Sequence, residues 1–118
     1  MILADTSVWV DHLRGGNARL MRLLNEGTVL VHPFVVGELA LGRLKRRSEI
    51  LGLLDEMPRA EEAEHAEVLA FVDRNELAGA GVGWIDAHLL VSAALSRAPL
   101  WTLDRRLAAV ATRLALSA

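Results

Sequence analysis

The sequence contains no cysteine, a single lysine and only five aromatic residues among its 118 positions. Without cysteine there are no disulfides and no thiolate metal sites, so any metal ion would be bound by oxygen or imidazole. No apolar run approaches the roughly 18 residues that span a bilayer. The N-terminus also lacks the basic start and small-residue cleavage site of a signal peptide. We therefore expect a cytoplasmic protein without a membrane partner.

The composition is that of a globular protein, with 53% hydrophobic and 24% charged residues. A chain of this length is long enough for one hydrophobic core and too short for two, which predicts a single domain over residues 1–118. The formal net charge of -2 provides no overall attraction to nucleic acid, so only a local basic patch could supply one. Solvated helix faces are the alternative interpretation of such patches. Three groups of residues could form such a basic patch: Arg14, Arg19 and Arg22; the run Arg43, Lys45, Arg46 and Arg47; and Arg105 with Arg106.

Short apolar runs alternate with longer amphipathic segments along the chain. Strands are expected at 2–4, 28–31 and 99–103, with a very short final strand near 115–117. Helices are expected between 8 and 14, 18 and 26, 33 and 44, 50 and 54, 61 and 77, 84 and 95, and 107 and 114. This alternation predicts a three-layer α/β/α fold with a mainly parallel sheet of four to five strands.

Two aspartates, Asp5 and Asp104, each follow an apolar strand-like run. Capping of the next helix is a sufficient local explanation for each of them. However, ligands bind outside the carboxyl ends of the strands in an open parallel sheet, and aspartates ending adjacent strands would meet there. The topology therefore makes both aspartates candidate site residues.

Two further acids lie on predicted helices. The helical period places Glu38 between Phe34 and Leu41, on the apolar side of its helix. An isolated buried carboxylate is strongly disfavoured, so Glu38 must be paired, protonated, bound to a cation or at the edge of a cleft. Asp86 lies in the first turn of the helix from Trp84, where the helix dipole favours an acid. Both acids are added to the candidate site.

Four carboxylates at one point would require a positive charge. At about 5 Å and an effective dielectric of about 20, each ionised pair repels by roughly 3 kcal/mol, and the six pairs together rival the stability of a small domain. Mg²⁺ or Mn²⁺ suits such oxygen ligands and can activate a water molecule for phosphodiester hydrolysis. The four histidines share no spacing motif, which argues against an imidazole site.

Hydroxyl groups lie beside the aspartates. Thr6, Ser7 and Thr102 could donate hydrogen bonds to the carboxylates and hold them in one rotamer. Capping of the backbone is the competing use of Thr6 and Ser7.

Four segments together resemble a known family. They are Asp5-Thr6-Ser7-Val8-Trp9, Glu38 after Pro33, the run from Gly83 to Leu90, and the run from Thr102 to Leu107. Their order and spacing resemble PIN-domain ribonucleases, specifically VapC-like toxins of toxin–antitoxin pairs, from about residue 2 to residue 114. A departure is Leu107, where many members have phenylalanine.

The resemblance implies a Mg²⁺- or Mn²⁺-dependent endoribonuclease with Asp5, Glu38, Asp86 and Asp104 as catalytic and metal-binding residues. Thr6 and Thr102 occupy the supporting hydroxyl positions. The family also implies a homodimer and a small VapB-like antitoxin that obstructs the acidic cleft. For the RNA substrate, Arg43, Arg46 and Arg47 are candidate phosphate contacts.

Three other functions are compatible with parts of the sequence. A phosphoacceptor receiver domain needs a lysine near its last strand, whereas the only lysine here is Lys45. An aspartate-nucleophile phosphatase needs a second aspartate two positions after the first, where this chain has Ser7. A catalytically silent PIN-fold interaction module is the stronger alternative, because the region 33–55 carries surplus apolar surface. A silent module would be expected to have lost at least one of the four acids.

Overall fold

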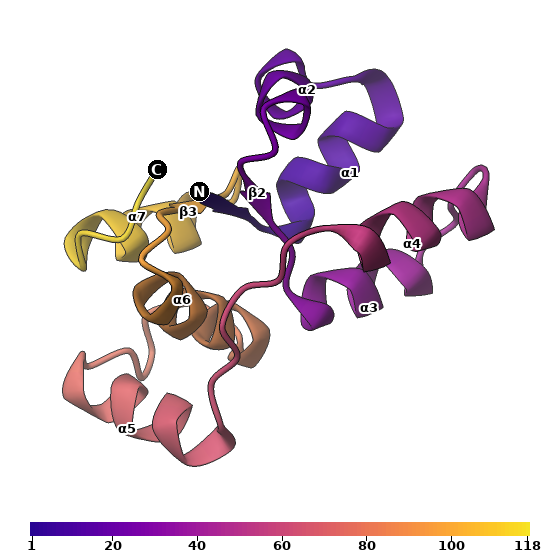
Figure 1. Ribbon diagram of the computed structural model, residues 1–118. Coiled ribbons are helices and arrows are strands. Elements are labelled where there is room, and N and C mark those ends of the chain that lie inside the picture. Colours follow the sequence, from indigo (N-terminus) through magenta and orange to yellow (C-terminus); the bar gives the residue numbers. More distant parts are fainter.

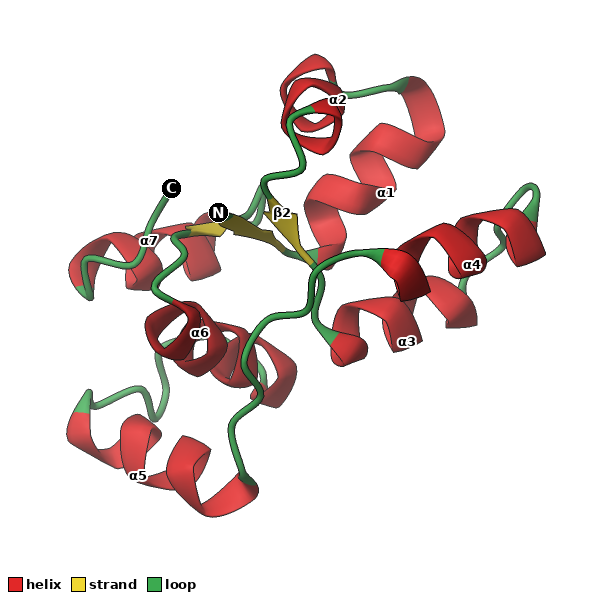
Figure 2. Cartoon of the chain, in the orientation of Figure 1, coloured by secondary structure: helices red, strands yellow, loops and turns green.

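The computed structural model describes all residues from 1 to 118, with seven helices around a small central sheet (Figure 1). Figure 2 shows how much of the chain is helical. In chain order the elements are β1 (Ile2–Ala4), α1 (Thr6–Gly15), α2 (Ala18–Asn25), β2 (Val29–Leu30), α3 (Pro33–Leu41), α4 (Arg47–Glu56), α5 (His65–Arg74), α6 (Trp84–Ser96), β3 (Leu100–Trp101) and α7 (Arg105–Arg113).

The sheet has the order β2-β1-β3, and both strand pairs are parallel. Leu3 of the central strand aligns with Leu30 on one side and with Leu100 on the other. The expected parallel α/β/α fold is therefore confirmed, but the prediction of four to five strands is wrong, since three strands form. Each sheet edge instead extends by a single bridge, Val31 with Arg59 and Leu100 with Ser117. These outer segments make too few ladder hydrogen bonds to count as strands.

The helices form layers around the strands. In the view of Figure 1, α1 and α2 lie above the sheet and α5 and α6 below it, while α3 and α4 pack together beyond β2. The expected helix 33–44 ends at Leu41, because the backbone becomes extended at Gly42. The expected helix 61–77 is also shorter: it starts after Glu64, whose backbone N–H donates to Glu67, and Asn75 caps its end. None of the seven helices is long and apolar enough to cross a membrane.

The core consists of the strands and the inner helix faces, with 22 buried residues in its main cluster. Every residue from Ala87 to Ala93 in α6 is buried, in keeping with the nearly unbroken apolar sequence of this helix. Trp9 and Trp101 are buried, whereas Trp84 is 40% exposed. The first turn of α6 therefore reaches the surface, beside Asp86.

Candidate active site

The strand order places the candidate site at a topological switch point. The chain leaves β1 towards β2 on one side and returns to β3 on the other, and ligands of such sheets bind outside the carboxyl ends of the strands at this point. Asp5 follows β1, and its backbone N–H donates to the carbonyl of Trp101 in β3 at 3.0 Å. Asp104 lies three residues beyond that point. The aspartates that end the two strand runs therefore come to the same sheet edge.

Asp5 is the most constrained of the four acids and is only 5% exposed. It is the N-cap of α1, and its Oδ1 accepts from the backbone N–H groups of Ser7 at 2.8 Å and Val8 at 3.4 Å. Its Oδ2 accepts from the hydroxyl of Thr102 at 2.6 Å. Helix capping and membership of the site are thus compatible, because the two carboxylate oxygens serve different partners.

The hydroxyl groups connect the two strand ends. Ser7 Oγ donates to Asp5 Oδ1 and accepts from the backbone N–H of Leu103 at 2.9 Å. Thr102 Oγ1 donates to Asp5 and accepts from the backbone N–H of Asp104 at 3.0 Å. The turn after β3 is therefore held to Asp5 through two side-chain hydroxyls. Ser7 thus makes a hydrogen bond that its position beside Asp5 allowed, whereas its contact with Leu103, 96 positions away in the sequence, was not predicted.

Asp104 is exposed and is the N-cap of α7, where its Oδ1 accepts from the backbone N–H of Leu107 at 2.9 Å. Leu107 is fully buried, so the first turn of α7 is anchored in the core. The substitution of leucine for phenylalanine at this position therefore concerns packing beneath the site. The second oxygen of Asp104 accepts no hydrogen bond within the protein.

Glu38 lies on α3 and is exposed, which differs from the apolar setting predicted by the helical period. The reason is that this side of α3 is only partly covered: Phe34 is 38% and Leu41 90% exposed. Glu38 Oε1 accepts from the Thr6 hydroxyl at 2.7 Å, directly beside Asp5. Glu38 is therefore hydrogen-bonded to Thr6 and lies at the edge of a cleft.

Asp86 is half-buried in the first turn of α6, and its Oδ2 accepts from the backbone N–H of Gly83 at 3.1 Å. Burial raises the pKa of this carboxyl above its ordinary value of 3.8, although the hydrogen bond from Gly83 opposes the rise. The negative charges of Asp5, Asp104 and Glu38 raise the pKa further. All four acids are thus close enough to interact electrostatically.

The donor set fits a hard divalent cation. Three carboxylate oxygens, Glu38 Oε2, Asp86 Oδ1 and Asp104 Oδ2, accept no hydrogen bond within the protein. No lysine or arginine forms an ion pair with any of the four acids, since the two salt bridges of the chain lie elsewhere. As the side chains stand, no three acidic or histidine groups are close enough to hold one ion between them. Some of these side chains would therefore have to move before one ion could be held by three of them.

Three of the four histidines belong to one row of aromatic rings. His32 contacts Phe34, Phe34 contacts His88, and His88 contacts Trp84, with centroid separations of 4.8 to 5.1 Å. Trp84 in turn contacts His65. Burial lowers the pKa of both His32 and His88, so both rings are neutral at pH 7. Their role in the fold is packing between α3 and α6.

The three arginines predicted to contact RNA are all exposed but lie in different settings. Arg43 lines a cleft together with Glu38. Arg46 caps α4 in a left-handed conformation, and Arg47 Nη1 donates to the carbonyl of Gly42 at 3.5 Å. Only Arg43 therefore shares a cavity with one of the four acids. Arg14 and Lys45 line the same cleft; both belong to the candidate basic patches, but neither was among the predicted phosphate contacts.

The sequence matches the PIN domain over residues 2–113, and the chain therefore belongs to the PIN-domain family. Within that family it is similar to Ribonuclease VapC32 of Mycobacterium tuberculosis, from strain CDC 1551 / Oshkosh and from strain ATCC 25618 / H37Rv alike. The identity is 49% over 110 residues, which cover 92% of this chain and 89% of the relative. The predicted resemblance to VapC-like PIN domains is confirmed.

Proposed function

We propose that this protein is a Mg²⁺- or Mn²⁺-dependent endoribonuclease and the toxin of a toxin–antitoxin pair. The observation that carries the proposal is that four carboxylates, with three uncommitted oxygens, lie within electrostatic range of one another near the carboxyl edge of a parallel sheet. The relative VapC32, whose name describes a ribonuclease, supports RNA as the substrate.

The acids would act as a prearranged ligand set. Thr102 and Ser7 orient the carboxylate of Asp5, and Thr6 orients that of Glu38, which limits the conformational freedom that each loses when the site is loaded. Asp86 and Asp104 are each fixed through one oxygen by a helix N-terminus, which leaves the other oxygen for a ligand. When bound, a divalent ion supplies charge neutralisation, Lewis acidity and activation of water for phosphodiester hydrolysis.

A protein partner and a second subunit complete the proposal. The VapC name of the relative supports a small VapB-like antitoxin as the partner that silences the enzyme. Apolar side chains exposed on α3 and α4, including Leu41 and Leu53, support contact with another protein chain. We infer that these surfaces bind the antitoxin and a second copy of the chain. Light scattering after gel filtration would measure whether the homodimer forms.

Cleavage of RNA tests the catalytic part of the proposal. Purified protein is incubated with structured and unstructured RNAs in Mg²⁺, and parallel samples contain a chelator. We expect cleavage only without chelator, and we expect its loss in Asp5→Asn. The matched control is Asp73→Asn, because Asp73 is exposed on α5 and makes no side-chain hydrogen bond. Undiminished Mg²⁺-dependent cleavage by Asp5→Asn would show that Asp5 has been wrongly assigned.

The alternative of a catalytically silent interaction module predicts a different result. Such a module would be folded and would bind its partner, yet no RNA would be cleaved under any metal condition. Expression in a bacterial host separates the two further. We expect expression alone to arrest growth, and co-expression of a small antitoxin encoded beside the gene to relieve the arrest. Normal growth at a high level of soluble protein would argue strongly against a toxin.

A further inference from the structure

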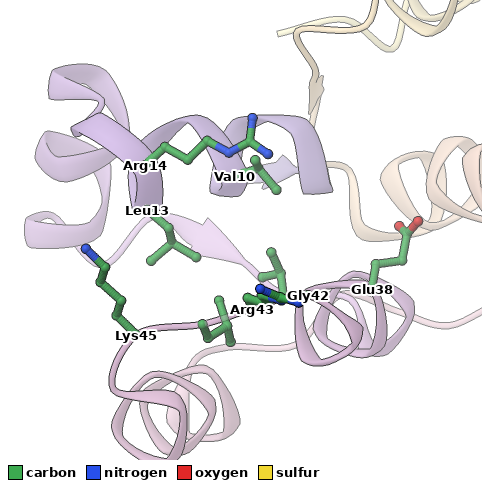
Figure 3. Close-up of a pocket in the computed structure, with 9 residues that line it drawn as sticks. Val10, Leu13, Arg14, Glu38, Gly42, Arg43 and Lys45 are labelled. Carbon is green, nitrogen blue, oxygen red and sulfur yellow. The ribbon is translucent and has the colours of Figure 1, made fainter.

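A basic cleft of about 360 Å³ lies between α1 and the segment that follows α3. Figure 3 shows Arg14 on one wall, Arg43 and Lys45 on the opposite wall, and Leu13 between them. Glu38 lies at one end of the cleft and Lys45 at the other. The volume falls within the range of pockets that bind small ligands.

The three cations of this cleft have no anionic partner in the protein. The only salt bridges join Arg22 with Glu26 and Arg59 with Asp55. The carboxylate of Glu38 lines the cleft but accepts from the hydroxyl of Thr6. Three unpaired positive charges around one hollow repel one another, and an anion bound among them removes this cost. The cleft is therefore electrostatically suited to an anion, although the chain as a whole has a net charge of -2.

The cleft is continuous with the carboxylate site. Glu38 belongs to both, because its Oε1 accepts from Thr6, the residue next to Asp5. A ligand that follows the cleft past Glu38 thus reaches the four acids. A linear chain with regularly spaced phosphates is long enough to lie in the cleft and to reach past Glu38 to a cation held by the four acids, which the proposed function requires there. The apolar side chains of Val10, Leu13, Leu39 and Leu44 also line the cleft and can contact a ribose or base.

We propose that the cleft lined by Arg14, Arg43 and Lys45 binds the sugar–phosphate backbone of a single RNA strand next to the phosphate at the four carboxylates. This inference rests on the proposed function, because it takes RNA as the ligand. Contacts to phosphate position a strand without reading its sequence. The cleft thus acts as a positioning site that holds the strand in register with the acids.

Binding measured without catalysis tests the cleft separately. A fluorescent single-stranded RNA is titrated with protein in chelator, and anisotropy is recorded across a range of salt concentrations. The variant Arg14→Gln, Arg43→Gln, Lys45→Gln should bind on the order of tenfold more weakly or worse at low salt. Its plot of log affinity against log salt should also be shallower by about 2, since each phosphate contact on a single strand contributes roughly 0.7.

The matched control replaces three exposed arginines away from the cleft, as Arg22→Gln, Arg74→Gln and Arg97→Gln. It removes the same charge. Its affinity should stay within a few-fold of the wild-type value, and its salt slope should be unchanged. Circular dichroism and the melting temperature of both triple variants check the fold. An unchanged affinity and slope in the folded cleft variant would overturn the proposal. An equal loss of affinity in both triple variants would also overturn the proposal, because it would reflect net charge alone.

Polyglutamate of equal charge is a second probe. Tighter binding of polyglutamate than of RNA, lost in the cleft variant, would identify an acidic protein partner and overturn the proposal. The proposed nuclease function is tested by a different readout. Absence of Mg²⁺-dependent cleavage by protein that still binds RNA through the cleft would reject the nuclease and retain the cleft.

Discussion

The hydroxyl of Thr102 donates to Asp5 Oδ2 at 2.6 Å, joining two residues that lie 97 positions apart in the sequence. The same hydroxyl accepts from the backbone N–H of Asp104 at 3.0 Å. A single side chain therefore orients one aspartate and positions the backbone of another. Because Asp5 is almost fully buried, loss of this donor would leave a carboxylate oxygen without a partner.

Thr102→Val removes the hydroxyl and keeps the shape of the side chain. We expect the free energy of unfolding to fall by about 1 to 3 kcal/mol, the cost of leaving a buried polar group unpaired. RNA cleavage should fall by roughly 10- to 100-fold, the usual effect of removing a partner that orients a metal ligand. Urea unfolding and a cleavage assay measure the two effects. Thr102→Ser should restore both, and Thr112→Val on the exposed side of α7 is the control.

Asp86→Asn should stabilise the metal-free protein at pH 7. The pKa of Asp86 is raised in the folded state, so between pH 3.8 and that raised value the folded protein binds more protons than the unfolded chain. The free energy of unfolding of the wild type therefore decreases as the pH rises through this window. Asparagine avoids this cost, and its advantage should shrink as the pH falls towards 3.8. Urea unfolding at several pH values in chelator measures the difference. A variant less stable than the wild type at pH 7 would contradict this prediction.

Divalent metal should stabilise the wild type, because an ion that binds only the folded state shifts the unfolding equilibrium. At 100 times the dissociation constant of Mg²⁺ or Mn²⁺, the gain is about 2.7 kcal/mol. The melting temperature should therefore rise with metal in the wild type and in Asp73→Asn, but much less in Glu38→Gln. An equal rise in all three proteins would place the metal elsewhere.

The stability of the protein should decrease in mild acid because of His32. Burial, with a smaller effect from the charge of His88, lowers the pKa of His32 from 6.5 to about 4. Between these values the unfolded chain takes up a proton that the folded protein does not, so the free energy of unfolding falls as the pH decreases from about 6.5 to 4. Urea unfolding at pH 7.5 and pH 5 would measure this loss.

His32→Asn should reduce that loss. Asparagine can still accept from the backbone N–H of Phe34 at the start of α3, as His32 Nδ1 does at 3.0 Å. The variant should be less stable than the wild type at both pH values, because a buried ring is removed. Its free energies of unfolding at pH 7.5 and pH 5 should nevertheless differ less than those of the wild type. His65→Asn is the control, since His65 is exposed. A loss in His32→Asn as large as in the wild type would exclude His32 as the cause.

Leu107→Ala should destabilise the protein by about 2 to 5 kcal/mol, the range for removing a buried leucine side chain. Leu107 is fully buried and anchors the first turn of α7 in the core, so a less firmly packed turn should also weaken metal binding at Asp104, although alanine keeps the backbone N–H that donates to this acid. Leu103→Ala is the matched control, because Leu103 is 50% exposed and only four positions away. A shift in the urea midpoint as small for Leu107→Ala as for Leu103→Ala would contradict this account.

The elements of the fold could largely be predicted from local patterns. Apolar runs of three to five residues, bounded by aspartate or proline, identified the strand positions around Leu3, Leu30 and Leu100. Helix caps such as Asp5 and Asp104 were recognisable because a short polar side chain before an apolar pattern satisfies the first N–H groups. Strand number was less predictable, since the edge segments at Arg59 and Ser117 pair through single bridges.

The sequence by itself determined the chemistry of the candidate site, because four acids and no cysteine leave only oxygen-rich ligands around Asp5, Glu38, Asp86 and Asp104. Only the tertiary structure decided which hydroxyl serves which acid and that Arg14 faces Arg43 and Lys45 across a cleft. Local patterns depend on neighbours within a few residues, whereas these contacts depend on the packing of α1, α3 and β3. That packing is set by the whole core, and no short segment specifies it.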